Sequence, residues 1–148
     1  MKQLTICVDF DGTCVTHEFP KVGKDIGAAP VLQRLVANGH RLILWTMRSD
    51  SEKVESDSEE ICSVAGNYLT DAVNWFKDND IPLFGINENL EQKSWTDSPK
   101  AYGQIYIDDA AAGCPLAYDK GLSDRTYVDW QLVEWYLVDR GVLKVITK

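Results

Sequence analysis

Two pairs of acidic residues directly follow apolar segments of the sequence, and these residues are the best suited to chemistry. Asp9 and Asp11 follow the first apolar segment, and Asp108 and Asp109 follow a later one. Carboxylates gathered at one site repel one another unless a cation binds or some of them are protonated. A hard divalent ion with oxygen ligands resolves that repulsion, and Mg²⁺ suits a site with few protein ligands. The four carboxylates therefore predict a magnesium site.

The first acidic pair belongs to the pattern D-x-D-G-T at positions 9–13. At a strand end, a spacing of two residues points both Asp side chains to the same side. Gly12 permits a sharp turn there, and Thr13 can hydrogen-bond the turn. For an isolated Asp pair, a role in a turn or a helix cap is the simpler interpretation. The added Gly and Thr favour a functional site.

The elements that must position these residues alternate along the chain. Short apolar runs predict strands, and apolar residues spaced three and four apart predict helices. This alternation is typical of an α/β fold, here a three-layer Rossmann-like fold with a mostly parallel central sheet. Right-handed crossovers would place helices on both faces. We expect strands at 4–8, 41–46, 83–86 and 104–108, an edge strand at 142–146, helices at 30–38, 69–76 and 128–136, and a loop with a small hairpin at 10–27.

In open parallel sheets, ligands bind outside the carboxyl ends of the strands. Asp9, Thr46 and the pair Asp108–Asp109 stand at three of these predicted strand ends. We therefore expect the functional site at this edge of the sheet.

Composition restricts the class of protein. The chain has 148 residues and a formal net charge of −8, with 45% hydrophobic residues, as in an ordinary globular domain. We expect one domain over residues 1–148. The acidic balance argues against a broad nucleic-acid or anionic-membrane surface. A small phosphorylated ligand, including a phosphate end of a nucleic acid, stays open. Residues 50–60 carry six acids and one Lys and predict a solvated segment.

The four cysteines show no metal-like spacing and are too sparse for a disulfide scaffold. No apolar run approaches the roughly 20 residues of a membrane helix. We expect reduced thiols and a cytoplasmic protein that has no contact with a membrane.

Four motifs in this order resemble those of the haloacid dehalogenase (HAD) superfamily of phosphohydrolases, and they span residues 4–109. The third motif is a Lys ahead of the last core strand, which Lys100 matches best, with Lys93 as its competitor. The first and fourth motifs are the specific ones. The four motifs are Ile6 to Thr13, Leu42 to Thr46, Ser98 to Tyr102 and Ile105 to Asp109.

The resemblance implies an Mg²⁺-dependent phosphatase that acts on a small phosphomonoester through an aspartyl-phosphate. Asp9 would be the nucleophile, and Asp11 would protonate the leaving oxygen and later activate water. Thr46 would hydrogen-bond the transferring phosphoryl group, and Lys100 would pair with Asp9 and the phosphate. The ion would be held by Asp9, the backbone carbonyl of Asp11, and Asp108. Asp109 would bind the ion through water or orient the site.

The resemblance also implies a capless member, because 13–30 and 46–100 are too short for a folded cap once core elements are counted. The loops 14–27 and 110–126, or a second copy in a homo-oligomer, would then cover the site. Arg48 is either a substrate-binding residue or a plain surface residue. We expect His17 to be exposed, Asn87 to form a turn, and Trp45 and Trp135 to be core residues.

Two other classes of protein compete with a phosphatase. A receiver-like signalling module would carry its phosphorylated Asp at the end of the third strand, where this chain has Ile86 and Asn87. A protein with the HAD fold that binds Mg²⁺ and a phosphorylated ligand without hydrolysis, or that transfers the phosphoryl group to another acceptor, is the alternative that stays open.

Overall fold

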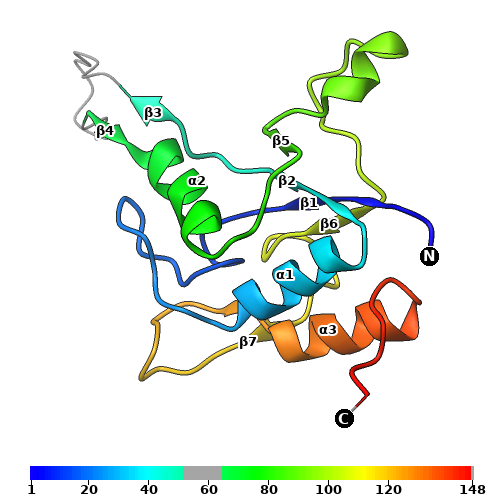
Figure 1. Ribbon diagram of the computed structural model, residues 1–148. Helices are drawn as coiled ribbons and strands as arrows, with labels where there is room; N and C mark the ends of the chain where they lie inside the picture. Colours follow the sequence, from blue (N-terminus) through cyan, green and yellow to red (C-terminus); the bar gives the residue numbers. More distant parts are fainter. Residues whose placement is uncertain (52–64, 148) are drawn as a thin grey trace.

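The centre of the molecule is a four-stranded parallel sheet. The computed structural model describes residues 1–51 and 65–147. The strand order is β5-β2-β1-β6, so β1 and β2 are the central strands (Figure 1). The predicted α/β architecture with a parallel sheet is confirmed. The strands are β1 (Thr5–Val8), β2 (Arg41–Leu44), β5 (Gly85–Ile86) and β6 (Ile105–Ile107).

The three α-helices all pack into the same core as one face of this sheet. They are α1 (Ala28–Ala37), α2 (Tyr68–Asp78) and α3 (Trp130–Asp139). That face presents alternate strand residues, among them Ile6 and Leu42, which are fully buried. The crossovers β1-α1-β2 and β2-α2-β5 step in the same direction across the sheet. Because both are right-handed, they place α1 and α2 on the same side.

The opposite face of the sheet is covered by the connection from β5 back to β6. This connection contains the short 3-10 helix η1 (Leu90–Ser94), which lies well away from α1 and α3 (Figure 1). Cys7 and Ile43 of that face pack against Ala101. The expectation of α-helices on both faces is therefore wrong for the part of the chain that the structure describes. The connection from β5 to β6 does lie on the face opposite the α-helices, as a right-handed crossover requires. It contains the 3-10 helix η1 in place of an α-helix.

Other elements differ from the expectations at the ends of the chain and in the loops. Residues 142–146 form no strand, because the backbone N–H groups of Val142 and Leu143 turn back to the carbonyl of Leu137 and close the end of α3. Trp135 is 60% exposed, so the prediction that it is a core residue is wrong. Two small antiparallel pairs are added, β3 (Asp50–Ser51) with β4 (Gly66–Asn67) and β7 (Leu116–Ala117) with β8 (Tyr127–Val128).

The loop 10–27 contains only isolated bridges, which join Val15 to Asp11 and to Asp25. The three described cysteines are free thiols. Cys62 and most of the acidic segment 50–60 lie outside the described residues. None of the described helices is long and apolar enough to cross a membrane.

The register of the sheet brings all four carboxyl ends to the same level. Val8 pairs with Leu44 on one side and with Ile107 on the other, and Leu44 pairs with Ile86. The residues that follow these ends therefore stand in one row across the edge of the sheet. In strand order, this row is Asn87, Trp45, Asp9 and Asp108.

The loop after β1 is fixed to α3 by one buried hydrogen bond, from Trp130 Nε1 to the carbonyl oxygen of Thr13 at 2.6 Å. We expect Trp130→Phe to lower the free energy of unfolding by about 2–4 kcal/mol, because it leaves this carbonyl unpaired and a cavity beside it. Urea unfolding measures the loss. Trp135→Phe makes the same change on the same helix at an exposed position and should alter stability by less than ~0.5 kcal/mol. Equal losses in the two variants would contradict this assignment.

Candidate functional site

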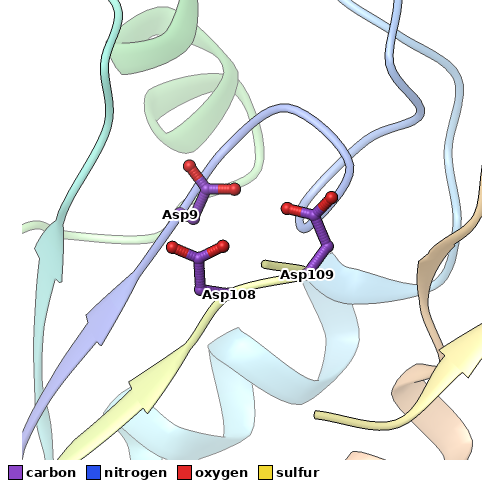
Figure 2. A group of neighbouring side chains, drawn as sticks. All are labelled: Asp9, Asp108 and Asp109. Carbon is purple, nitrogen blue, oxygen red and sulfur yellow. The ribbon is translucent and has the colours of Figure 1, made fainter. Parts of the chain in front are cut away.

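Three carboxylates converge at the carboxyl ends of β1 and β6. One oxygen from each of Asp9, Asp108 and Asp109 lies within 4.8 Å of the other two. Figure 2 shows Asp9 and Asp108 side by side and Asp109 facing them from the start of the next loop. All three residues are half-buried. The expectation that the two acidic segments meet at this edge is confirmed for these three residues.

The hydroxyl of Thr13 connects the two strand ends. It accepts a hydrogen bond from the backbone N–H of Asp109 at 3.1 Å and donates one to Asp9 Oδ2 at 2.8 Å. The small side chain of Thr13 is completely buried, so this bridge is shielded from water. Thr13 thus fixes the position of Asp9 Oδ2 relative to the end of β6.

The environment of Asp9 opposes its negative charge. Burial raises the pKa of Asp9 to about 7, and the charges of Asp108 and Asp109 add to the effect, whereas the hydrogen bond from Thr13 opposes it. A bound cation would relieve the same electrostatic strain, since it replaces the missing water and offsets the repulsion. An all-oxygen donor set from carboxylates matches Mg²⁺ and not a thiophilic metal. The residues therefore fit a hard divalent ion.

His17 also belongs to this site. Its Nε2 lies 2.7 Å from Asp109 Oδ2, and its side chain is 16% exposed. The prediction of an exposed loop His is wrong. A Cβ at Gly12 would lie 1.9 Å from His17 Nε2, so the glycine of the D-x-D-G-T pattern is what lets the imidazole reach Asp109. The contact between His17 and Asp109 could be recognised only from this close approach to Gly12. The spacing of residues along the chain does not show it.

Asp11 lies outside the carboxylate triad and is bound by Arg48. Arg48 Nε donates to Asp11 Oδ2 and Nη2 donates to Asp11 Oδ1, both at 2.7 Å. This two-bond geometry engages both carboxylate oxygens. The side chain of Asp11 is therefore not directed at a cation shared with the triad, and only its backbone carbonyl stays available for the metal role predicted from the resemblance.

The remaining donors of Arg48 are engaged as well. Nη1 donates to the carbonyls of Tyr68 and Pro20, and Nη2 donates to that of Lys21. With Asp11, these partners account for all five N–H groups of the guanidinium. Arg48 is 4% exposed, so the alternative of a plain surface Arg is wrong. A contact between Arg48 and a substrate phosphate would require one of these bonds to break.

A pocket of about 320 Å³ opens beside the triad. Thr46, which sequence motifs place at the end of β2, does lie in it together with two of the triad residues. Thr46 Oγ1 accepts from the backbone N–H of Arg48 at 3.1 Å, and among the described residues no acceptor engages its own hydroxyl hydrogen. The pocket is lined by Asp9, Trp45, Thr46, Met47, Asn87 and Asp108.

The two candidate lysines lie apart from the triad. The Lys100 ammonium lies 5.2 Å from the ring centroid of Tyr106, two residues before Asp108 on β6. Its charge opposes the effect of burial on Cys7, which still has its pKa raised to about 11. Lys93 is exposed and lies 4.0 Å from Glu88. Among the described residues, neither lysine forms an ion pair with Asp9. Lys100 lies on the same face of the sheet as Asp9, but beside Tyr106, one residue before the end of the strand that leads to Asp108.

Comparisons with known proteins identify a fold but no family. No protein-family model matches the sequence, and no curated protein matches it. The chain is similar to the solved structure of a conserved protein of Bacteroides thetaiotaomicron, with a TM-score of 0.67 and 26% sequence identity. The similarity covers 94% of this chain and 93% of the other. The overall fold is therefore similar to the fold of that protein over most of both chains.

The raised pKa of Asp9 predicts a particular dependence of stability on pH in the absence of metal. The folded state keeps the Asp9 proton up to about pH 7, whereas the unfolded chain loses it near pH 3.8. The stabilising contribution is therefore fully present below pH 3.8 and is lost as the pH rises through about 7. With EDTA present, the free energy of unfolding should fall as the pH rises from 4 to 8. We expect this fall to be roughly 2–4 kcal/mol larger in the native protein than in Asp9→Asn.

Chemical unfolding at several pH values between 4 and 8 measures this difference, and added Mg²⁺ should reduce it. If the free energy of unfolding changes with pH in the same way in both proteins, the pKa of Asp9 is not raised by folding.

Proposed function

We propose that this protein is a Mg²⁺-dependent phosphohydrolase of the HAD type, without a cap domain, which cleaves a small phosphomonoester through an aspartyl-phosphate. The observation that carries the proposal is the convergence of Asp9, Asp108 and Asp109 beside a pocket that also contains Thr46. A nucleophile, a set of metal ligands and a hydroxyl donor are the groups that this chemistry needs at one place. A cytoplasmic location stays an expectation of the sequence.

The triad and the backbone carbonyl of Asp11 would hold Mg²⁺. When bound, the ion offsets the negative charges of the carboxylates and of the phosphoryl oxygens, so that an anionic nucleophile can approach an anionic substrate. His17 would keep Asp109 in its present orientation through the 2.7 Å contact.

In the first half-reaction, Asp9 uses the carboxylate oxygen that does not accept from Thr13. This oxygen forms a bond to phosphorus while the bond from phosphorus to the leaving oxygen breaks. A protonated Asp11 gives its proton to the leaving oxygen, so that an alcohol departs and Asp11 is left as a carboxylate. Thr46 donates its hydroxyl hydrogen to the transferring group.

In the second half-reaction, the Asp11 carboxylate takes a proton from water as the water oxygen attacks phosphorus. The bond between phosphorus and the Asp9 oxygen breaks, and inorganic phosphate leaves. The paired carboxylate of Asp11 matches the charge state that this step requires. Arg48 is then a positioning residue, which must release one carboxylate oxygen before Asp11 can exchange a proton with the substrate.

Lys100 would contribute by moving its ammonium from Tyr106 toward the edge of the sheet. Two residues along a strand correspond to about 6.8 Å, which the four-carbon stem of a lysine can span. There it would pair with the phosphoryl oxygens as charge develops.

A second candidate function is phosphate binding without hydrolysis, or transfer to an acceptor other than water. The observation that favours it is the occupation of both Asp11 oxygens by Arg48, which removes the acid-base group from the pocket in this conformation. Binding of Mg²⁺ and phosphate without release of phosphate from any substrate would support this alternative.

The proposed nucleophile predicts a loss of activity that leaves the fold intact. In an assay of phosphate release with Mg²⁺ and a broad set of phosphomonoesters, Asp9→Asn should lower kcat by at least ~1000-fold, because an amide cannot attack phosphorus. Its unfolding temperature should equal or exceed that of the native protein, since the change removes a buried charge.

Asp78→Asn, which makes the same change at an exposed position near the end of α2, is the matched control and should retain full activity. The proposal is overturned if the native protein releases no phosphate, or if Asp9→Asn retains its turnover.

A further inference from the structure

Asn87 occupies the end of the row of residues that follows the strand ends. Ile86 pairs with Leu44 in the sheet, so Asn87 stands beside Trp45, and Asp9 and Asp108 come next in the row. It also lines the pocket of about 320 Å³ with both of these acids. Sequence patterns alone predict only a turn here, and the backbone does turn, with a φ of 54° that Asn tolerates better than most residues.

Two hydrogen bonds fix the direction of this side chain. The backbone N–H of Asn87 donates to the carbonyl of Leu44 at 2.7 Å, and Asn87 Oδ1 accepts from the backbone N–H of Thr46 at 2.8 Å. Because Oδ1 is engaged as an acceptor, the other terminal atom of the amide, Nδ2, must be the donor. The carboxamide is therefore held against the end of β2 in one orientation.

The unused hydrogen-bonding capacity of Asn87 among the described residues lies at Nδ2. Within residues 1–51 and 65–147, no hydrogen bond from Nδ2 to a protein acceptor is present. A turn would need the backbone and Oδ1 alone, so it does not account for the two N–H donors of a side chain that lines the pocket. Thr46, whose N–H binds the same carboxamide, lines the same pocket, and its hydroxyl hydrogen has no acceptor in the described part of the chain.

The surrounding charges define what these donors would bind. The pocket presents carboxylates at one side and neutral donors at the other, and no lysine or arginine from residues 1–51 or 65–147 lines it. A phosphoryl group attached to Asp9 would direct its other oxygens, which are acceptors only, away from the nucleophile. Donors that are neutral and held in place would stabilise such oxygens alongside the magnesium ion and the Lys100 ammonium.

We propose that Asn87 is a substrate-binding residue for the phosphoryl group, with Nδ2 donating to a nonbridging oxygen next to the hydroxyl of Thr46. The proposal rests on the proposed function, because it places the phosphoryl group at Asp9. Asn87 and Thr46 together form the donor side of the site, opposite the carboxylates.

Asn87→Asp tests this role with the smallest change of shape. The new carboxylate keeps an acceptor for the Thr46 N–H, but it replaces Nδ2 with an anionic oxygen that repels phosphate. At saturating Mg²⁺, calorimetry with inorganic phosphate should show binding weakened about 10- to 100-fold, as expected for loss of one hydrogen bond to a charged group. Asn87→Gly, which keeps the backbone conformation, should weaken binding in the same direction.

Two measurements separate a role in binding from a role in folding. The unfolding temperature of Asn87→Asp should stay close to that of the native protein, and Mg²⁺ affinity measured alone should not fall. Lys77→Gln, an exposed change on α2 that alters net charge by the same amount, is the control and should bind phosphate normally.

Unchanged phosphate binding in both Asn87 variants would overturn the role of Asn87 and leave the proposed function intact. Failure of the native protein to bind phosphate with Mg²⁺, together with full activity of Asp9→Asn, would overturn both proposals.

Discussion

The register of the parallel sheet is the constraint on which the site depends. Because Val8 pairs with both Leu44 and Ile107, the chain has to place Asp9 and Asp108 next to each other where their strands end. Partial burial then removes much of the water that would screen Asp9, and the pKa of this residue rises to about 7. The fold thereby concentrates negative charge in a place where only a proton or a cation can balance it.

The surrounding residues divide this charge into two parts. The side chain of Asp11 is balanced by two donors of Arg48, whose other three donors bind backbone carbonyls of neighbouring segments. Asp109 faces His17, and Thr13 donates to Asp9. The four carboxylates that the acidic pairs predict at one site are therefore divided in the structure into a triad and a separate ion pair. The negative charge that still needs a partner lies on the triad, and largely on Asp9 and Asp108.

The sequence predicts those features of the fold and the site that depend on residues close together along the chain. Short apolar runs located the four core strands, and the acidic residues that follow two of these runs located Asp9, Asp108 and Asp109. The partners of Arg48, His17 and Asn87 depend on loops that meet only in the folded chain, such as the contact of His17 with Gly12. Trp135 fits a helical apolar stripe but lies on a side of α3 that the other described elements leave uncovered, and it is 60% exposed.

The most direct test of the account is whether Asp9 itself becomes phosphorylated. Asp11→Asn should still let Asp9 attack a substrate with a good leaving group, such as an aryl phosphate, but it should slow the attack of water. After incubation with Mg²⁺ and acid quenching, mass spectrometry should find one phosphoryl group on the peptide that contains Asp9. Hydrolysis by the native protein with no such adduct in the variant, or an adduct on another residue, would contradict the account.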